Sequence, residues 1–434
     1  MHVLLINPPA AAAHVREGRC TQATHLWGTA WPPLTLAYCA AVLHDAGHTA
    51  CLLDGAVQRL TDDVVRRAAA AAQVAVVAVG NDTGVGDCAF AAMLKSINPA
   101  LTVILIGTYA AACVTQIFAD YTGIAAIVVG EPEYSLRDCV AACAVGAPLP
   151  GIPGVMTPAA SLITRPFIEP LDALPFPRWE CIDTQRYRLP LLRRRLLLVA
   201  PMRGCPYPCT FCTTQQYYGT RVRTRSVASV IAELERNVRD FGVRDFLFWA
   251  ETLTGNRPFV MALCEELQRR ALRMRWSAAS RVDTVDAEML RAMRAAGCRM
   301  LSFGIESLSQ DVLDQCGKRM CVEEIAPAIH MARAAGLWTV GHFIIGLPGD
   351  TPERARATVT GATRLPLDFA QFYAAAAFAG SRLQQALGPV ARAGASQADF
   401  QHLPEELRGI ARGAARHFYG TPRRLLYWSQ HLWL

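Results

Sequence analysis

Charged side chains are scarce in this chain, and no stretch of it is apolar enough to cross a bilayer. Asp, Glu, Lys and Arg make up 18% of the 434 residues, whereas hydrophobic residues make up 52%. The longest apolar runs, residues 74–80 and 103–107, have the length of strands and fall short of the roughly 18 to 20 residues that a membrane span needs. The composition excludes a mostly disordered chain, and the length suits two or three domains.

The N-terminus also lacks an export signal. Residues 1–9 read MHVLLINPP, with no basic segment followed by a long apolar stretch and a cleavage site. Fifteen cysteines in an unexported chain argue against a disulfide framework, because the cytosol keeps thiols reduced. The formal charge of +7 comes from scattered arginines, which is more typical of a solvated surface than of nucleic-acid binding. We therefore expect a cytoplasmic protein that binds neither nucleic acid nor membrane.

The first third of the chain alternates short apolar strands with helical stretches. We predict strands at residues 2–7, 49–54, 74–80, 102–107 and 124–130, with helices at 34–46, 62–72, 87–98 and 110–121. This alternation predicts a doubly wound α/β domain over residues 1–146, which would bind a ligand at the carboxyl ends of its strands.

The rest of the chain divides into three further parts. Residues 147–190 are rich in proline, which prevents long helices and predicts an ordered connector. Strand–helix alternation resumes over residues 191–385 with six predicted strands, as in a partial (βα)6 barrel. Residues 386–434 are predicted to be helical. The fold class is therefore α/β throughout, with a small helical C-terminal region.

A proline- and glycine-rich loop follows the first strand of the predicted barrel and contains three thiols. Residues 203–212 read RGCPYPCTFC, which places Cys205, Cys209 and Cys212 within eight positions. Thiolates are the usual ligands of iron–sulfur clusters, and three of them leave one iron of a cubane open. Zinc would need a fourth Cys or His, and none lies between Leu189 and Arg225. The pattern favours a cluster over zinc.

This spacing, with an aromatic residue before the last cysteine, resembles the signature of the radical S-adenosylmethionine (SAM) superfamily. The resemblance implies a 4Fe-4S cluster whose open iron binds SAM and whose electron cleaves SAM to a 5′-deoxyadenosyl radical. Later segments match by order and context, including GIES at residues 304–307 and GHFIIGLPGD at 341–350.

The resemblance also implies which residues contact SAM. Glu251 would hold the amino group, Ser280 and Arg281 the carboxylate, and Glu306 the ribose hydroxyls. The full implied set is Phe211, Glu251, Ser280, Arg281, Glu306, Phe343 and Ile345. No residue is assigned to acid–base catalysis. We interpret the twelve other cysteines mostly as buried hydrophobic residues, and packing is favoured over a role as acid or radical donor for Cys316.

The N-terminal half resembles the cobalamin-binding domain of one branch of that superfamily. The segments WPPLTLAY (31–38), HDAGH (44–48), KSINP (95–99) and VGEPE (129–133) occur in the family's order. The Asp-x-His-x-x-Gly segment that supplies a cobalt ligand in other cobalamin folds is absent, so no His of that motif would bind cobalt. The implied cobalamin-binding residues are Pro8, Asn81, Asp82, Thr83, Gly84, Gly107, Thr108, Tyr109, Gly130, Glu131 and Glu133.

Together the resemblances imply a cobalamin-dependent radical SAM methyltransferase. It would transfer a methyl group through methylcobalamin to an unactivated carbon, or phosphorus, of a small metabolite or natural-product intermediate. An external flavodoxin- or ferredoxin-like protein would supply electrons. A non-methylating rearrangement, cyclisation or oxidation is the alternative, and a non-catalytic cobalamin sensor is a remote one. The sequence identifies neither the substrate nor the oligomeric state.

Overall fold

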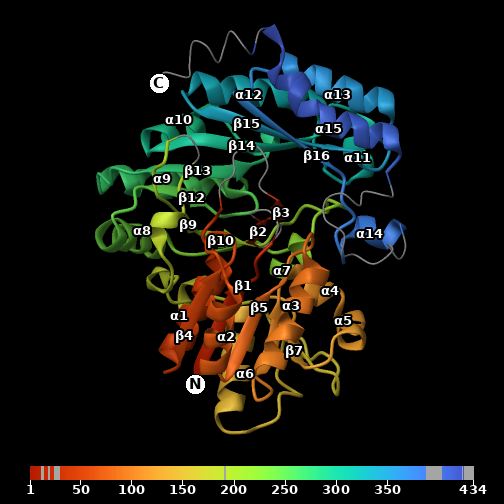
Figure 1. Cartoon of the computed structure of the whole chain (residues 1–434). Helices are drawn as coiled ribbons and strands as arrows, with labels where there is room; N and C mark the ends of the chain where they lie inside the picture. The colour runs from red at the N-terminus through yellow and green to blue at the C-terminus, as the bar shows by residue number, and fades with distance from the viewer. Residues whose placement is uncertain are drawn as a thin grey trace.

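The computed structural model contains two six-stranded sheets, one from each half of the chain (Figure 1). It describes residues 1–10, 14–17, 20–23, 30–189, 192–387, 403–422 and 424. Among these, no helix is both long enough and apolar enough to cross a membrane. The predicted α/β fold class is confirmed.

The first sheet has the strand order β4-β1-β5-β6-β7-β8 and is parallel except for its edge strand β8. Its strands are β1 (His2–Asn7), β4 (Thr49–Asp54), β5 (Val74–Ala78), β6 (Thr102–Ile106), β7 (Ile124–Val128) and β8 (Val155–Met156). The five parallel strands lie where they were predicted, and the predicted connector supplies β8. Continuous apolar runs suit this sheet because helices cover both of its faces.

In the described part of the first half, six helices cover the first sheet. They are α1 (Leu34–Asp45), α2 (Asp62–Ala71), α3 (Gly84–Ile97), α4 (Thr108–Ala112), α5 (Val114–Asp120) and α6 (Pro132–Ala144). Leu36 of α1 and Leu136 of α6 pack on one face, with Val3 and Leu5 of β1. The helices α2 to α5 pack on the other face. The predicted helix at residues 110–121 is instead two short helices that meet at Cys113.

The second sheet is fully parallel, with the order β16-β15-β14-β13-β12-β9. Its strands are β9 (Leu196–Val199), β12 (Asp245–Phe248), β13 (Arg275–Ser280), β14 (Cys298–Glu306), β15 (Trp338–Ile345) and β16 (Phe369–Ala374). No pairing joins β16 to β9 among the described strands, so the sheet matches the predicted partial barrel.

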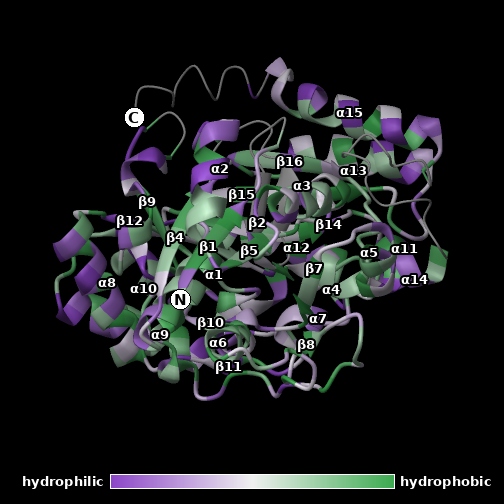
Figure 2. Cartoon of the chain, turned by 60° about the horizontal axis from the view of Figure 1, so that its bottom comes forward, coloured by the Kyte–Doolittle hydropathy of each residue, from purple (hydrophilic) through white to green (hydrophobic). Residues whose placement is uncertain are grey.

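The longer helices of the second half pack on the second sheet. They are α8 (Val227–Phe241), α9 (Arg257–Arg269), α10 (Ala287–Ala295), α12 (Ile325–Ala334), α13 (Pro352–Arg364) and, in the C-terminal region, α15 (Glu405–Tyr419). Side chains cap the start of α8, α9, α10 and α13. For example, the Ser226 side chain caps the start of α8, and Gly242 ends it in the left-handed conformation. Figure 2 shows hydrophilic residues on the outward sides of α8 and α15.

The two halves share an apolar core through the connector. Tyr38 of α1 belongs to the same buried cluster as Trp179 of the connector, Leu198 of β9 and Val230 of α8. The side chain of Trp179 is fully buried. A two-stranded hairpin of β2 (His14–Glu17) and β3 (Cys20–Ala23), which was not predicted, lies between the two sheets (Figure 1).

Candidate functional site

The three cysteines lie in a loop between β10 (Met202–Arg203) and α7 (Thr214–Tyr218). Each of these cysteine residues is partly exposed, and the Cys212 thiol donates a hydrogen bond to Thr214 Oγ1 at 3.2 Å. Within the described parts of the chain, no three His, Cys, Asp or Glu side chains converge closely enough to hold a single metal ion. The donor set of three thiols in one loop is nevertheless the one that an iron–sulfur cluster with an open iron requires.

Contacts with four segments hold the cysteine loop in place. The backbone N–H of Thr210 donates to the carbonyl of Cys316 at 2.9 Å, and Leu383 N–H donates to the Thr210 carbonyl at 2.8 Å. The guanidinium of Arg281 stacks 3.6 Å above the ring of Tyr207. Phe211 packs against an apolar cluster that includes Cys316 and residues after β15 and β16. The loop therefore lies over the carboxyl ends of the second sheet.

The structure places three of the predicted SAM contacts at the ends of adjacent strands. Ser280 ends β13, Arg281 follows it, and Glu306 ends β14. Arg281 forms two hydrogen bonds with Asp283, at 2.8 and 2.7 Å, and a third with the carbonyl of Arg319. Glu306 has a positive φ of 66°, and its carboxylate pairs with Lys318 at 2.7 Å. Backbone strain of this kind persists where surrounding contacts enforce it, often at functional sites.

The side chains of three other predicted SAM contacts are buried after β12 or on the helix-covered face of β15. Glu251 is buried three residues after β12. Phe343 and Ile345 of β15 are fully buried on the helix-covered face, where Ile345 packs with α13 and α15. Because side chains alternate along a strand, Ile344 points to the opposite face, toward the cluster that contains Phe211. Phe343 and Ile345 can therefore contribute only backbone atoms to a ligand on that face.

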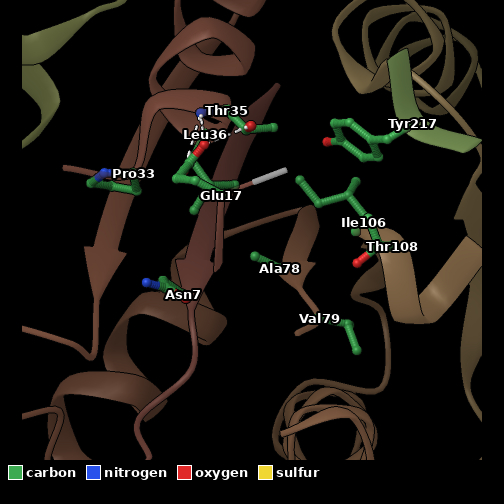
Figure 3. A pocket seen from close by; sticks show the side chains of 11 residues that line it. Asn7, Glu17, Pro33, Thr35, Leu36, Ala78, Val79, Ile106, Thr108 and Tyr217 are labelled. Atoms are coloured by element: carbon green, nitrogen blue, oxygen red, sulfur yellow. Dashed lines mark hydrogen bonds between the residues drawn. The ribbon is translucent and has the colours of Figure 1, made fainter. Parts of the chain in front are cut away.

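A pocket at the carboxyl ends of β1, β5 and β6 meets the barrel half at α7 (Figure 3). Predicted residues Gly107 and Thr108 line it. The other predicted strand-end residues lie outside its lining. The full lining is Asn7, Glu17, Pro33, Thr35, Leu36, Ala78, Val79, Ile106, Gly107, Thr108 and Tyr217. The space inside it is about 20 Å³, which is enough for about one water molecule.

Sequence reasoning did not predict the other nine lining residues, among them Glu17 and Tyr217. Tyr217 follows the last cysteine by five positions, and its hydroxyl points into the pocket opposite Glu17 (Figure 3). Both carboxylate oxygens of Glu17 accept from the Thr35 N–H, at 3.2 and 3.1 Å, and Oε2 also accepts from the Thr35 hydroxyl at 2.9 Å. Burial raises the pKa of Glu17 to about 8 despite these bonds. No local motif marks either residue.

Glu131 and Glu133, which were predicted to contact cobalamin, do not line this pocket. Their buried carboxylates pair with the barrel half, where Arg203 lies 3.0 Å from Glu131 and 2.5 Å from Glu133. Arg223 pairs with Glu131 at 2.9 Å. Buried carboxylates require such partners, so these two residues join the halves of the molecule. The same position brings Arg203, next to the cysteine loop, against the first domain.

Residues 199–360 match the model of the Radical SAM superfamily. The chain is also 30% identical, over 88% of its own length and 82% of the relative's, to an uncharacterized methyltransferase of Pyrococcus horikoshii. The chain belongs to the radical SAM superfamily. It is 28% identical to an anaerobic magnesium-protoporphyrin IX monomethyl ester cyclase of Rubrivivax gelatinosus, an alignment that spans 76% of this chain and 61% of the cyclase.

The fold is that of the cobalamin-dependent radical SAM enzymes, as the sequence predicted. The structure of the radical SAM methyltransferase TsrM from Kitasatospora setae, with cobalamin and a [4Fe-4S] cluster bound, superposes with a TM-score of 0.68. That likeness covers 86% of this chain and 74% of TsrM at 22% identity. At this level of identity the likeness shows a shared fold, which extends over both halves of the chain.

Proposed function

We propose that this protein is a cobalamin-dependent radical SAM methyltransferase that acts on an unactivated carbon, or phosphorus, of a small molecule. The observation that supports the proposal is that the helix after the cysteine loop also lines the candidate cobalamin pocket of the first half. Tyr217 of α7, the helix that follows the cysteine loop, lines the pocket at the strand ends of the first domain. A cobalt-bound group and a radical formed at the cluster would therefore meet at the boundary between the halves.

The residues around these sites have distinct tasks in the proposed enzyme. Cys205, Cys209 and Cys212 would hold the 4Fe-4S cluster, and Arg281 and Glu306 would bind the carboxylate and ribose of SAM. Gly107 and Thr108 would contact cobalamin. When bound, the cluster supplies the electron that cleaves SAM, and cobalamin carries the methyl group. Tyr207 and Thr210 keep the cysteine loop above the strand ends through their contacts with Arg281 and Cys316.

Electrons would come from an external flavodoxin- or ferredoxin-like protein. All described cysteines are free thiols, which suits the reducing cytoplasm that we propose as the location. The predicted division into a cobalamin domain (1–146), a connector (147–190), a barrel (191–385) and a helical region (386–434) stays a proposal.

Product analysis without the substrate tests this function. Anaerobic protein loaded with iron, sulfide and cobalamin should, after reduction, convert SAM to S-adenosylhomocysteine, because a methyltransferase must first methylate its cobalt. The Cys212→Ala variant should lose the 5′-deoxyadenosine that the wild type forms slowly. If the wild type forms 5′-deoxyadenosine but no S-adenosylhomocysteine, the methyl-transfer proposal fails. The likeness to a cyclase then makes a non-methylating reaction the better interpretation.

A further inference from the structure

Residues 316–319, which follow α11 (Gln310–Gln315), contact three parts of the candidate SAM site. The Cys316 carbonyl accepts from Thr210 N–H in the cysteine loop at 2.9 Å. The Arg319 carbonyl accepts from Arg281 Nη2, also at 2.9 Å. Between them, Lys318 pairs with Glu306. One short segment therefore connects the cysteine loop, the candidate carboxylate-binding residue and the candidate ribose-binding residue.

The fit between this segment and the cysteine loop leaves no room for a side chain at Gly317. Its φ is +69°, and an added Cβ would lie 2.8 Å from the Pro208 carbonyl oxygen. Glycine is the residue that adopts this conformation without strain. The backbone on both sides of Lys318 is therefore held in one position, which limits where its ammonium can reach.

The Lys318–Glu306 pair is buried and uses one carboxylate oxygen. The two side chains are 7% and 8% exposed, and Nζ lies 2.7 Å from Oε1. Among the described residues, Glu306 Oε2 accepts no hydrogen bond. Gly304 makes space for the pair, since a Cβ there would lie 2.7 Å from Oε1 and 2.9 Å from Nζ. One oxygen is thus fixed, and the other is available to a ligand.

Lysine is rare in this chain, so its presence here is informative. Lys95 and Lys318 are the only lysines among 43 lysines and arginines. A compact ammonium fits beside Gly304, whereas a planar guanidinium needs more space and more acceptors. Burial is the largest single effect and lowers the pKa of Lys318, but the charge and hydrogen bond of Glu306, together with the nearby Cys209, raise this pKa overall. The lysine therefore stays charged beside the Glu306 carboxylate.

We propose that Lys318 is a positioning residue of the SAM site, whose ammonium fixes Oε1 of Glu306 so that Oε2 accepts hydrogen bonds from the ribose hydroxyls. This inference rests on the proposed function, because it assumes that Glu306 binds the ribose. Lys318 itself need not touch SAM. Its effect should therefore depend on the carboxylate of Glu306 and on the hydroxyls of the ligand.

Binding measurements on the reconstituted enzyme test the proposal. Lys318→Met should weaken SAM binding by about ten-fold or more, the usual effect of losing a hydrogen bond that involves a charge. Iron content per chain should stay at the wild-type level. Lys318→Met should weaken binding of the 2′-deoxyribose analogue of SAM by a smaller factor than it weakens binding of SAM, because the analogue has fewer ribose hydroxyls to donate to Glu306. Lys95→Met is the matched control, since the Lys95 ammonium also donates one hydrogen bond, to the Leu101 carbonyl at 2.8 Å, but lies in the first half of the chain.

A double-mutant cycle separates positioning from a general structural role. If Lys318 acts through Glu306, then E306Q/K318M should bind SAM as E306Q alone does. The double variant also removes both buried charges, so it remains informative if Lys318→Met alone fails to fold. An additional loss in the double variant would overturn the proposal. Three results for Lys318→Met would also overturn it: SAM affinity equal to that of the wild type, equal losses of affinity for SAM and its 2′-deoxyribose analogue, or loss of iron. Failure of the wild type to bind iron or SAM would instead refute the proposed function.

Discussion

Glu17 is a buried carboxyl group that lines the pocket between the two halves. Burial raises its pKa from about 4.5 to about 8. A carboxyl with a raised pKa binds its proton more tightly in the folded chain, so its contribution to stability is greatest below pH 4.5 and is lost as pH rises toward 8. We expect Glu17→Gln to remove this pH dependence of stability, because an amide does not titrate. The amide oxygen can still accept a hydrogen bond from Thr35.

Melting temperatures of the apo protein at pH 5.5 and 8 measure this effect. The melting temperature of Glu17→Gln minus that of the wild type should be larger at pH 8 than at pH 5.5. In the free energy of unfolding, the difference between the two proteins should change by up to about 1.4 kcal/mol per pH unit. Glu323→Gln, at an exposed position, is the control and should give parallel profiles. Parallel profiles for Glu17→Gln as well would show that Glu17 is ionised in the folded protein.

Cys209 and Cys264 provide a comparison between a proposed ligand and a packing cysteine. Cys209 lies in the cysteine loop, whereas Cys264 is buried in the apolar core on α9. Cys209→Ala should reduce iron and sulfide in the reconstituted protein to trace levels, because two thiolates do not hold the cluster. Cys264→Ala should keep full iron content and lose only about 1 kcal/mol of stability. Equal iron content in both variants would contradict the ligand assignment.

At the scale of elements, the turn into the cysteine loop depends on glycine. Gly204 has φ +98°, and a Cβ would lie 2.2 Å from the Arg221 carbonyl oxygen on the neighbouring segment. Gly204→Ala should cost about 1 to 3 kcal/mol and lower iron content, since the loop must move away from β11 (Arg223–Thr224).

Gly86 is the matched control for that substitution. It lies within α3, and no atom is within 4 Å of an added Cβ. Gly86→Ala should therefore stabilise the protein by up to about 1 kcal/mol, because alanine loses less entropy in a helix. Thermal unfolding and iron analysis of the two variants measure both effects. A Gly204→Ala variant as stable and as iron-rich as wild type would refute the tight-turn argument.

At the scale of the whole molecule, Arg203 joins the halves through buried charges. It pairs with Glu131 and Glu133, and its guanidinium also lies over the rings of Tyr38 and Tyr218. Arg203→Met should destabilise the protein by about 3 to 5 kcal/mol, because it leaves buried carboxylates without their partner. Adding Glu133→Gln should restore part of the loss, since it removes one uncompensated charge.

Arg257 gives the control for this network at the surface. It pairs with Asp286 and Glu288, but its side chain is 46% exposed. Arg257→Met should therefore change the free energy of unfolding little, because exposed ion pairs are weakened by water and salt. Chemical denaturation of the apo protein compares the two variants. If Arg203→Met costs no more than Arg257→Met, the network does not stabilise the joint between the halves.

The sequence by itself determined the strands, the class of fold and the cysteine loop. Apolar periodicity and turn residues act between near neighbours in the chain, so β1, β5 and the loop from Cys205 to Cys212 could be predicted locally. The hairpin β2–β3 was missed because its neighbours in space are α1 and the strand ends, which its own residues do not specify. The break at Cys113 was missed for lack of a local helix-ending signal.

Only the tertiary structure decided which distant side chains meet. Glu131 follows a strand end like a ligand-binding residue, yet packing of the barrel brings Arg203 and Arg223 to its carboxylate. Lys318 is twelve positions from Glu306, and its role depends on a backbone position set by the cysteine loop. Glu17 and Tyr217, two hundred residues apart, form one pocket. Such contacts depend on how whole elements pack, and no periodicity within one element encodes that packing.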